Sequence, residues 1–181
     1  HQPAAESGTP SAFSEVVADA GVLTAADFTC LLEIDPDMSD DAWLLGSWVP
    51  EGVQEPPAES LATAGASLMA LTRGRHFVCA TDEIQALSAN PWFAREGFTS
   101  YIVNALMRSD GQRLGLLVAL WRQAPADIAG ACAVMSIVGV RAATVLSRLA
   151  TERDLKESEQ RYGAVFEGSS TPILLIEPGT T

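Results

Sequence analysis

Three cysteines and one internal histidine are the side chains of this chain with the clearest capacity for chemistry. Cys30, Cys79 and Cys132 are widely spaced, each lies in an apolar run, and His76 is close in sequence only to Cys79. Residues three apart on a strand point to opposite faces, so His76 and Cys79 do not form the ion pair of a catalytic thiol. The sequence contains no CxxC pair and no Cys/His cluster with zinc spacing. This pattern predicts reduced, buried thiols in a cytoplasmic protein and no structural zinc site.

An acidic loop, "DPDMSDD" from Asp35 to Asp41, has carboxylates at the first, third and sixth positions of a calcium-binding loop. The calcium loop needs Gly at its sixth position and Glu at its twelfth, where this chain has Asp40 and Gly46. We therefore interpret this segment as the solvated connection of a β-hairpin.

The charge distribution disfavours whole classes of partner. The formal net charge is -12, and residues 1–72 hold twelve acidic residues and no Lys or Arg. Without a basic stripe the chain has no means of releasing counterions from nucleic acid or an anionic membrane. The uncharged stretch 128–140 is shorter than the roughly 20 residues that cross a bilayer, and the first residues do not resemble a signal peptide. We expect neither nucleic acid nor a membrane as a partner.

Hydrophobic periodicity predicts an α+β domain with an antiparallel sheet flanked by helices. The predicted strands are 27–35, 42–49, 76–81, 100–107 and 113–121. The predicted helices are 11–21, 55–74, part of 82–98, and a long C-terminal helix from 126 to about 161. Asp110-Gly111 is a strong hairpin signal, and the run after it is apolar on both faces, as expected for a central strand.

Residues 11–150 resemble a GAF domain. The resemblance rests on the segment "NPWF" followed by "GFTSYIVNALMRSDGQRLGLL", which is similar to the family's paired strands and their Asp-Gly hairpin. One departure is Ala105, where the family commonly has Pro. The resemblance implies a sensory regulatory module of a bacterial signal-transduction protein, such as a two-component system, with no catalytic residues of its own.

The resemblance also implies a small-molecule pocket between the sheet and its connections. The candidate pocket residues are Phe77, Cys79, Trp92, Phe93, Tyr101 and Val103. These side chains either line a cavity or simply fill the core. The ligand stays unknown, because the Cys-His neighbours of bilin-binding relatives, a cyclic-nucleotide motif and a heme signature are all missing. The spacing of the thiols also differs from the clustered cysteines of GAF reductases, which leaves a thiol-based reductase as a minor alternative.

The long helix carries a predicted dimer seam and leads into a second resemblance. Val138, Ala142, Val145 and Leu149 have heptad spacing, which shifts to Leu155 and Tyr162 further along. The segment "LKESEQRYGAVFEGSSTPILLIEPG" resembles the start of a PAS domain. We therefore divide the chain into a tail at 1–10, the GAF domain at 11–150, a connecting signalling helix at 151–162 and an incomplete PAS start at 163–181. We expect a homodimer that signals to a PAS and an output domain. The competing hypothesis is a ligand-free dimerisation or spacer module.

Overall fold

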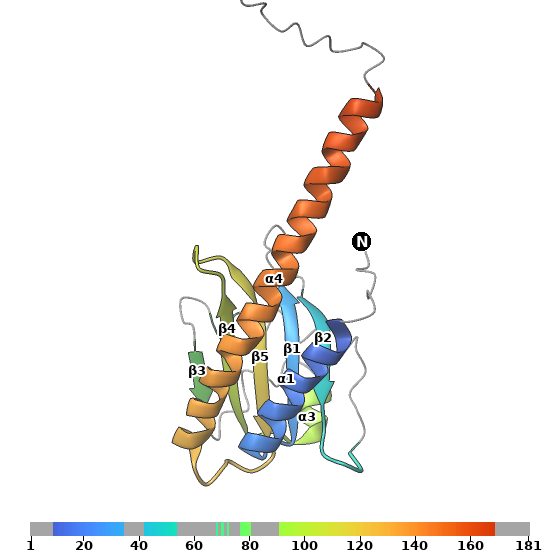
Figure 1. Ribbon diagram of the computed structural model, residues 1–181. Coiled ribbons are helices and arrows are strands. Elements are labelled where there is room, and N and C mark those ends of the chain that lie inside the picture. Colours follow the sequence, from blue (N-terminus) through green and yellow to red (C-terminus); the bar gives the residue numbers. More distant parts are fainter. Residues whose placement is uncertain are drawn as a thin grey trace, which may run out of the picture. The chain divides into compact units, whose positions relative to one another are not determined.

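The computed structural model describes residues 9–34, 42–53, 68, 70, 72, 77–80 and 91–168 (Figure 1). The elements are α1 (Thr9–Thr24), β1 (Phe28–Ile34), β2 (Ala42–Trp48), β3 (Phe77–Ala80), α3 (Pro91–Glu96), β4 (Ser100–Met107), β5 (Arg113–Trp121) and α4 (Ile128–Gly168). The chain divides into two compact units with the boundary after Ser147. The predicted α+β class with a long C-terminal helix is confirmed.

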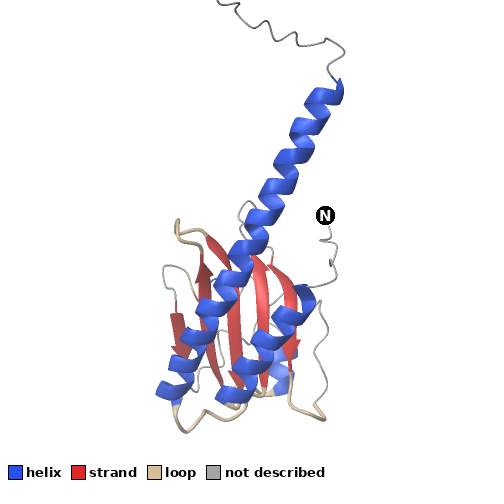
Figure 2. Ribbon diagram, viewed as in Figure 1, coloured by secondary structure: helices blue, strands red, loops and turns tan. Residues whose placement is uncertain are grey.

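The five strands form one antiparallel sheet in the order β2-β1-β5-β4-β3 (Figure 2). Strand β5 lies at the centre, and every residue from Leu114 to Trp121 is buried, as its two apolar faces predict. The strands β4 and β5 have the predicted bounds, because the turn at Asp110-Gly111 fixes their pairing. The predicted helix 55–74 lies almost wholly outside the described residues. The segment 82–98, predicted to be partly helical, is described only from residue 91 and contains α3.

Side-chain alternation divides the sheet into two faces. The cluster face contains Phe28, Cys30, Leu32, Tyr101, Val103, Leu116, Val118 and Leu120. The helix face contains Leu31, Ile102, Leu106, Leu117 and Ala119. Helices α1 and α4 cross the helix face, while α3 lies on the other side of the sheet (Figure 1).

Helix α1 ends later than its sequence suggests. The predicted helix 11–21 stops at Gly21, whereas α1 continues to Thr24. A Cβ atom on Gly21 would overlap the indole of Trp48 in β2, so this glycine lets helix and strand pack closely. The helix ends where Ala25 adopts a φ of 49° and the N–H of Ala26 donates to the carbonyl of Gly21 at 3.0 Å.

The first part of α4 packs on the helix face. Its buried residues are Ala131, Met135, Val138, Gly139, Ala142 and Leu146, which recur at helical spacing. The amide of Asn104 in β4 donates to the Met135 carbonyl at 3.0 Å. Although its uncharged stretch is short, α4 from Ile128 to Tyr162 is long and apolar enough by length and composition to cross a membrane. The contact with the sheet accounts for the buried part of this stretch, which is 28% of its apolar window.

The part of α4 beyond Ser147 belongs to the second unit. It carries an ion pair between Arg148 and Glu152 at 2.8 Å and exposes the side chains of Leu155 and Tyr162. Residues 163–168, predicted as the beginning of a PAS domain, continue this helix. The rest of the predicted PAS start, 169–181, lies outside the described residues.

The contact between Gly139 and Asn104 predicts that replacing Gly139 by Ala destabilises the protein, although Ala has the higher helix propensity. A Cβ atom at position 139 would overlap the Asn104 amide nitrogen, whose place is fixed by its bond to Met135. We expect Gly139→Ala to lower the free energy of unfolding by about 1–3 kcal/mol through overpacking, although Ala favours a helix by about 1 kcal/mol over Gly. Urea denaturation measures this change. The control Ala133→Gly, at an exposed site of α4, should lose only about 1 kcal/mol; a more stable Gly139→Ala would contradict the contact.

Candidate functional site

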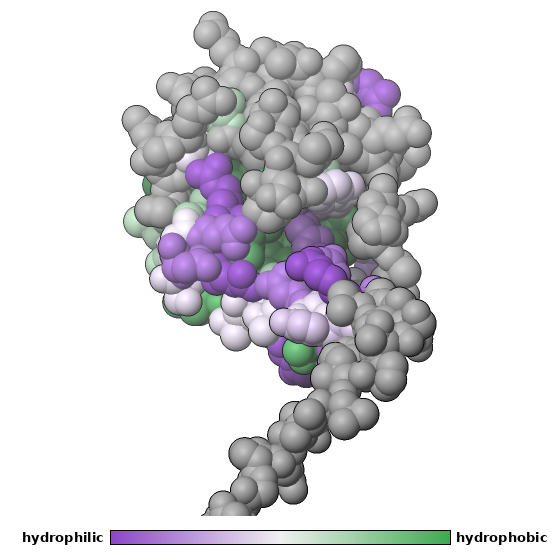
Figure 3. Space-filling model, turned by 90° about the horizontal axis from the view of Figure 1, so that it is seen from above, coloured by the Kyte–Doolittle hydropathy of each residue, from purple (hydrophilic) through white to green (hydrophobic). Residues whose placement is uncertain are grey.

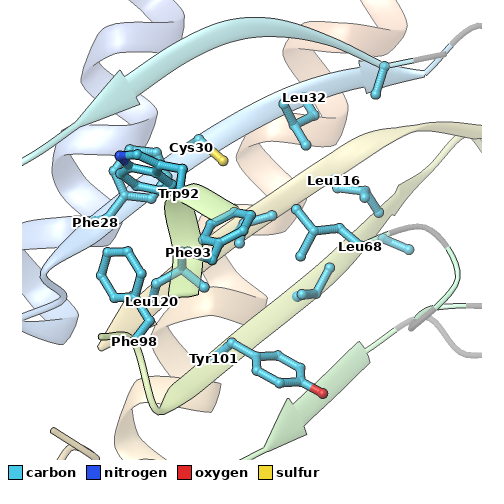
Figure 4. Packing of buried hydrophobic residues seen from close by; sticks show 14 of the residues in the cluster. Phe28, Cys30, Leu32, Leu68, Trp92, Phe93, Phe98, Tyr101, Leu116 and Leu120 are labelled. Atoms are coloured by element: carbon cyan, nitrogen blue, oxygen red, sulfur yellow. The ribbon is translucent and has the colours of Figure 1, made fainter. Parts of the chain in front are cut away.

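The six candidate pocket residues lie on two different faces of the sheet. Trp92, Phe93, Tyr101 and Val103 belong to one buried cluster on the cluster face (Figure 4). Phe77 pairs with Asn104 in the β3–β4 ladder, and Asn104 contacts α4. Phe77 therefore lies on the helix face.

Cys79 shares that placement, because it lies two residues after Phe77 on the same strand and pairs with Ile102. Val78 and Ala80 of β3 pack against the cluster in place of Phe77 and Cys79. The prediction of one cavity lined by all six residues is thus corrected. Four of them come together, and two are separated from them by the sheet.

Four aromatic rings form the centre of the cluster. Trp92 lies 5.4 Å from Phe28, 5.0 Å from Phe93 and 5.5 Å from Phe98 between ring centroids. The pairs with Phe28 and Phe93 are edge-to-face, a favourable arrangement for aromatic quadrupoles. Sequence reasoning missed Phe28 and Phe98 as members of the site. The alternation of Phe28, Cys30 and Leu32 was the signal that could have placed Phe28 beside the candidates.

Arg122 holds the aromatic cluster in place from the end of β5. Its Nε donates to the Glu96 carbonyl at 2.9 Å, and its Nη2 lies 3.1 Å from the Glu96 carboxylate. Its backbone N–H donates to Asp27 at 2.7 Å, and its Nη1 lies 3.4 Å from the same carboxylate. The guanidinium also lies 5.3 Å from the centroid of Phe98. One side chain thus ties the end of α3 and the start of β1 to the central strand, and no sequence motif pointed to it.

The chemistry of the cluster suits an apolar ligand. Its members are all apolar or aromatic residues, which bind a small molecule by burial and ring contacts. Among the described residues, no group of three or more His, Cys, Asp or Glu side chains is placed to hold a metal ion. Figure 3 looks at the molecule from above and shows hydrophobic residues bordered by hydrophilic ones on the visible described surface.

A hollow of about 700 Å³ lies on the helix face at the end of β5, where Asp27 and Arg122 belong to its lining. It is lined by the end of α1, the end of β5 and the start of α4, including Leu23, Trp121 and Asp127. Its polar groups are engaged within the protein: the Trp121 indole N–H donates to the Thr24 carbonyl, and Asp127 accepts from the Gly130 N–H. These contacts show that the polar groups of the hollow already have partners within the protein.

The three thiols have different environments, although the sequence predicted all of them to be buried. Cys30 is buried in the cluster, and burial raises the pKa of its thiol well above the ordinary range. Cys79 is exposed, so the prediction is wrong for this residue. Partial burial and the neighbouring thiol of Cys132 raise the pKa of Cys79 to about 11. Two thiols far apart in the sequence are therefore neighbours.

The contacts of Arg122 predict that this residue orders α3. Arg122→Lys keeps the charge but loses the planar guanidinium that reaches Glu96 and Asp27 together. We expect amide hydrogen exchange in residues 91–98 to become roughly 5- to 12-fold faster, the equivalent of losing about 1–1.5 kcal/mol of hydrogen bonding. Mass spectrometry of that peptide measures the rate. The control Arg95→Lys, at an exposed residue of α3, should leave it unchanged; equal rates in the two variants would remove this role from Arg122.

No protein-family model matches the sequence, and no curated protein matches it. Solved structures do match. The GAF domain of PixJ from Thermosynechococcus elongatus, in its blue-light absorbing form, is 18% identical with a TM-score of 0.59 over 84% of this chain and 93% of that chain. A second structure of that cyanobacteriochrome GAF domain is 20% identical with a TM-score of 0.56, over 83% and 99% of the two chains.

The chromophore-binding domain of the bacteriophytochrome RpBphP3 from R. palustris is more distant. It is 10% identical with a TM-score of 0.51, and the match covers 79% of this chain. The chain spans only 58% of the length of that domain. The antiparallel sheet, the flanking helices and these similarities agree: the chain has the fold of a GAF domain.

Proposed function

We propose that this chain is a sensory regulatory module that binds a small apolar molecule in the aromatic cluster and passes the change to α4. One observation carries the proposal: strand β4 contributes to both sites. Tyr101 and Val103 face the cluster, whereas Ile102 and Asn104 face the helices. A ligand that displaces the cluster side of β4 therefore moves the residues that contact α4.

The contact between β4 and α4 is short and specific, which makes it suitable for such a relay. The Asn104 amide donates to the Met135 carbonyl, and Gly139 leaves the space that this amide occupies, because a Cβ atom there would overlap it. Because packed contacts change between discrete arrangements, a small displacement of β4 changes this bond. The ligand shifts the helix only by the difference in its affinity for the two arrangements.

The similar structures support a ligand-binding role for this fold. One of them is described as a chromophore-binding domain and another as a blue-light absorbing form. We do not propose a bilin for this chain, because its sequence lacks the Cys-His neighbours of bilin-binding relatives. The apolar lining of the cluster favours instead a small hydrophobic or aromatic molecule.

We propose α4 as the output of the module in a cytoplasmic homodimer. The helix continues to Gly168, and the apolar side chains of Leu155 and Tyr162 are exposed. A PAS domain and an output domain of a bacterial signalling protein are the expected downstream partners, as the resemblance at 155–179 implies.

The position of the proposed dimer contact differs from the heptad seam. Val138 is 7% exposed and Ala142 is fully buried within their own unit, so neither side chain is available to a second copy. Ile137 and Val140 are 72% and 69% exposed on the same helix. Exposed apolar side chains on a surface helix favour association, so the proposed contact moves to these two residues.

The competing hypothesis is a ligand-free dimerisation or spacer module. The ring distances within the cluster favour it, since Trp92 already contacts three aromatic neighbours at 5.0–5.5 Å. The GAF-type thiol reductase is less favoured, although Cys79 and Cys132 are neighbours. Cys79 lies on the helix face, so a substrate in the aromatic cluster does not meet it.

The two phenylalanines on opposite faces provide a matched test of ligand binding. We expect the full chain, isolated from its own cells, to carry an additional small mass in native mass spectrometry. Phe93→Leu should weaken retention of that molecule about 2- to 12-fold, because one aromatic contact is lost. Phe77→Leu removes a ring from the helix face and should leave retention unchanged. A wild-type chain without additional mass, or equal effects of both changes, would favour the spacer module.

The exposed residues of α4 predict how the chain associates. We expect the double change Ile137→Asp and Val140→Asp to convert a dimer to a monomer, since charged groups at an apolar contact lose their hydration. Light scattering coupled to size-exclusion chromatography measures the mass. Ala94→Asp, at an exposed site of α3 on the other side of the sheet, is the control and should stay dimeric. A monomeric wild type, or a double variant that remains dimeric, would reject this contact.

A further inference from the structure

Two thiols from distant parts of the chain meet on the helix face. Cys79 lies on β3, one of the two edge strands of the described sheet, and Cys132 lies in the first turns of α4. Cys79 pairs with Ile102 of the neighbouring strand β4. Both cysteines belong to the unit that ends at Ser147.

The contacts between β4 and α4 show why these thiols are neighbours. The position of Gly139 lies against both Leu106 and Asn104, and Asn104 bonds to Met135. Residues with lower numbers in β4 therefore lie beside residues with lower numbers in α4. The step from Asn104 to Ile102 is about 6.8 Å, and the step from Met135 to Cys132 is about 4.5 Å in the same direction.

Cys132 thus lies level with Ile102, and Cys79 is the partner of Ile102 in the ladder. The two side chains are near enough for the Cys132 thiol to contribute to the raised pKa of Cys79. Cys79 is exposed and Cys132 is partly exposed, so an oxidant in solution reaches the pair. Cys30 is fully buried on the other face of the sheet and has no part in it.

We propose that Cys79 and Cys132 form a redox-modification site, at which a peroxide converts the two thiols to an intramolecular disulfide that links β3 to α4. This inference is independent of the ligand and of the proposed sensory function. It requires only that the two side chains have the placement described above.

The reaction balances with hydrogen peroxide as the oxidant. The Cys79 thiolate attacks one peroxide oxygen, the O–O bond breaks, and the second oxygen leaves as hydroxide, which takes up the proton released by Cys79. The resulting sulfenic acid is attacked by the Cys132 thiol, and the S–O bond breaks with release of a second water. Overall, two thiols and one peroxide give one disulfide and two waters. Two equivalents of a cellular thiol reverse the change by exchange.

The environment of Cys79 makes this site slow at neutral pH. Partial burial and the Cys132 thiol raise its pKa to about 11, so only a small fraction is thiolate near pH 7. The thiolate is the attacking form. At a pH below the pKa, each increase of one pH unit raises the thiolate fraction about tenfold. The pair therefore responds to sustained rather than brief exposure to peroxide.

The disulfide would restrain the contact that surrounds Asn104. One of its cysteines lies on β3, which pairs with β4, and the other lies on α4, which packs on the face of β4. Because it closes a long loop of the chain, it restricts the unfolded state strongly. We expect the oxidised chain to unfold at a midpoint roughly 4–16 °C above that of the reduced chain.

The experiment treats the reduced full chain with hydrogen peroxide, blocks the remaining thiols with N-ethylmaleimide and maps the peptides by mass spectrometry. We expect a peptide that joins Cys79 to Cys132, and labelling of Cys30 only after denaturation. Cys132→Ser should abolish the link, while Cys30→Ser should retain it. The rate of linking should rise about tenfold from pH 8 to pH 9, and the midpoint should rise with the link.

Four outcomes would overturn the proposal. One is oxidation of Cys79 to a sulfinic acid with no link to Cys132, and another is a link that joins two chains rather than one. The third is a link that survives in Cys132→Ser, and the fourth is a rate that does not change with pH. Since none of these measurements involves a ligand, a failed ligand test of the sensory function leaves this result unaffected.

Discussion

Strand β5 has no face in contact with solvent from Leu114 to Trp121, and its alternating side chains therefore need an apolar layer on each side. On one side that layer is the aromatic cluster beneath α3, and on the other it is α1 and the first part of α4. Each covering element is apolar only along the stripe that meets the sheet. The double burial of one strand thus explains the architecture of the first unit, and Arg122 at the end of that strand fastens both α3 and β1 to it.

Strand β4 lies next to β5 and has the same two-sided character, with one polar exception. Asn104 interrupts its helix face with an amide that would be costly to bury without a partner. The Met135 carbonyl supplies that partner at 3.0 Å, and Gly139 supplies the space. A polar bond within an otherwise apolar contact has a defined geometry, whereas apolar side chains tolerate sliding. This bond therefore makes the position of α4 sensitive to the position of β4, which is the physical basis of the sensory role proposed above.

The edge of the sheet has a different character. Strand β3 has one neighbour in the described sheet, so its helix-face side chains are only partly covered. Cys79 remains exposed there, and α4 brings Cys132 beside it. Cys30, on a strand with neighbours on both sides, is fully buried. The same residue type therefore has three environments, and reactivity is confined to the two thiols at the edge.

Much of the fold could be predicted because its signals are local. The alternation in 100–107 and 113–121, the Asp-Gly turn between them and the uninterrupted helix that follows all depend on residues close in sequence. The motif resemblance that implied a GAF fold used the same segment, and the similar structures agree with it. Membership of Trp92, Phe93, Tyr101 and Val103 in one cluster was also within reach, since large apolar side chains seek the interior.

The sequence by itself determined the strands, the long helix and the apolar character of the site, because each depends on the period of side chains along one element. Only the tertiary structure decided which face each element turns toward the core. Phe77 and Cys79 lie away from the aromatic cluster because the β3–β4 pairing aligns Val78 with Val103. The heptad residues Val138 and Ala142 lie against their own sheet rather than a second copy. Heptad spacing shows that a helix has an apolar stripe, but it does not show which surface that stripe contacts. Register and contact are properties of two segments at once, and so is the meeting of Cys79 with Cys132.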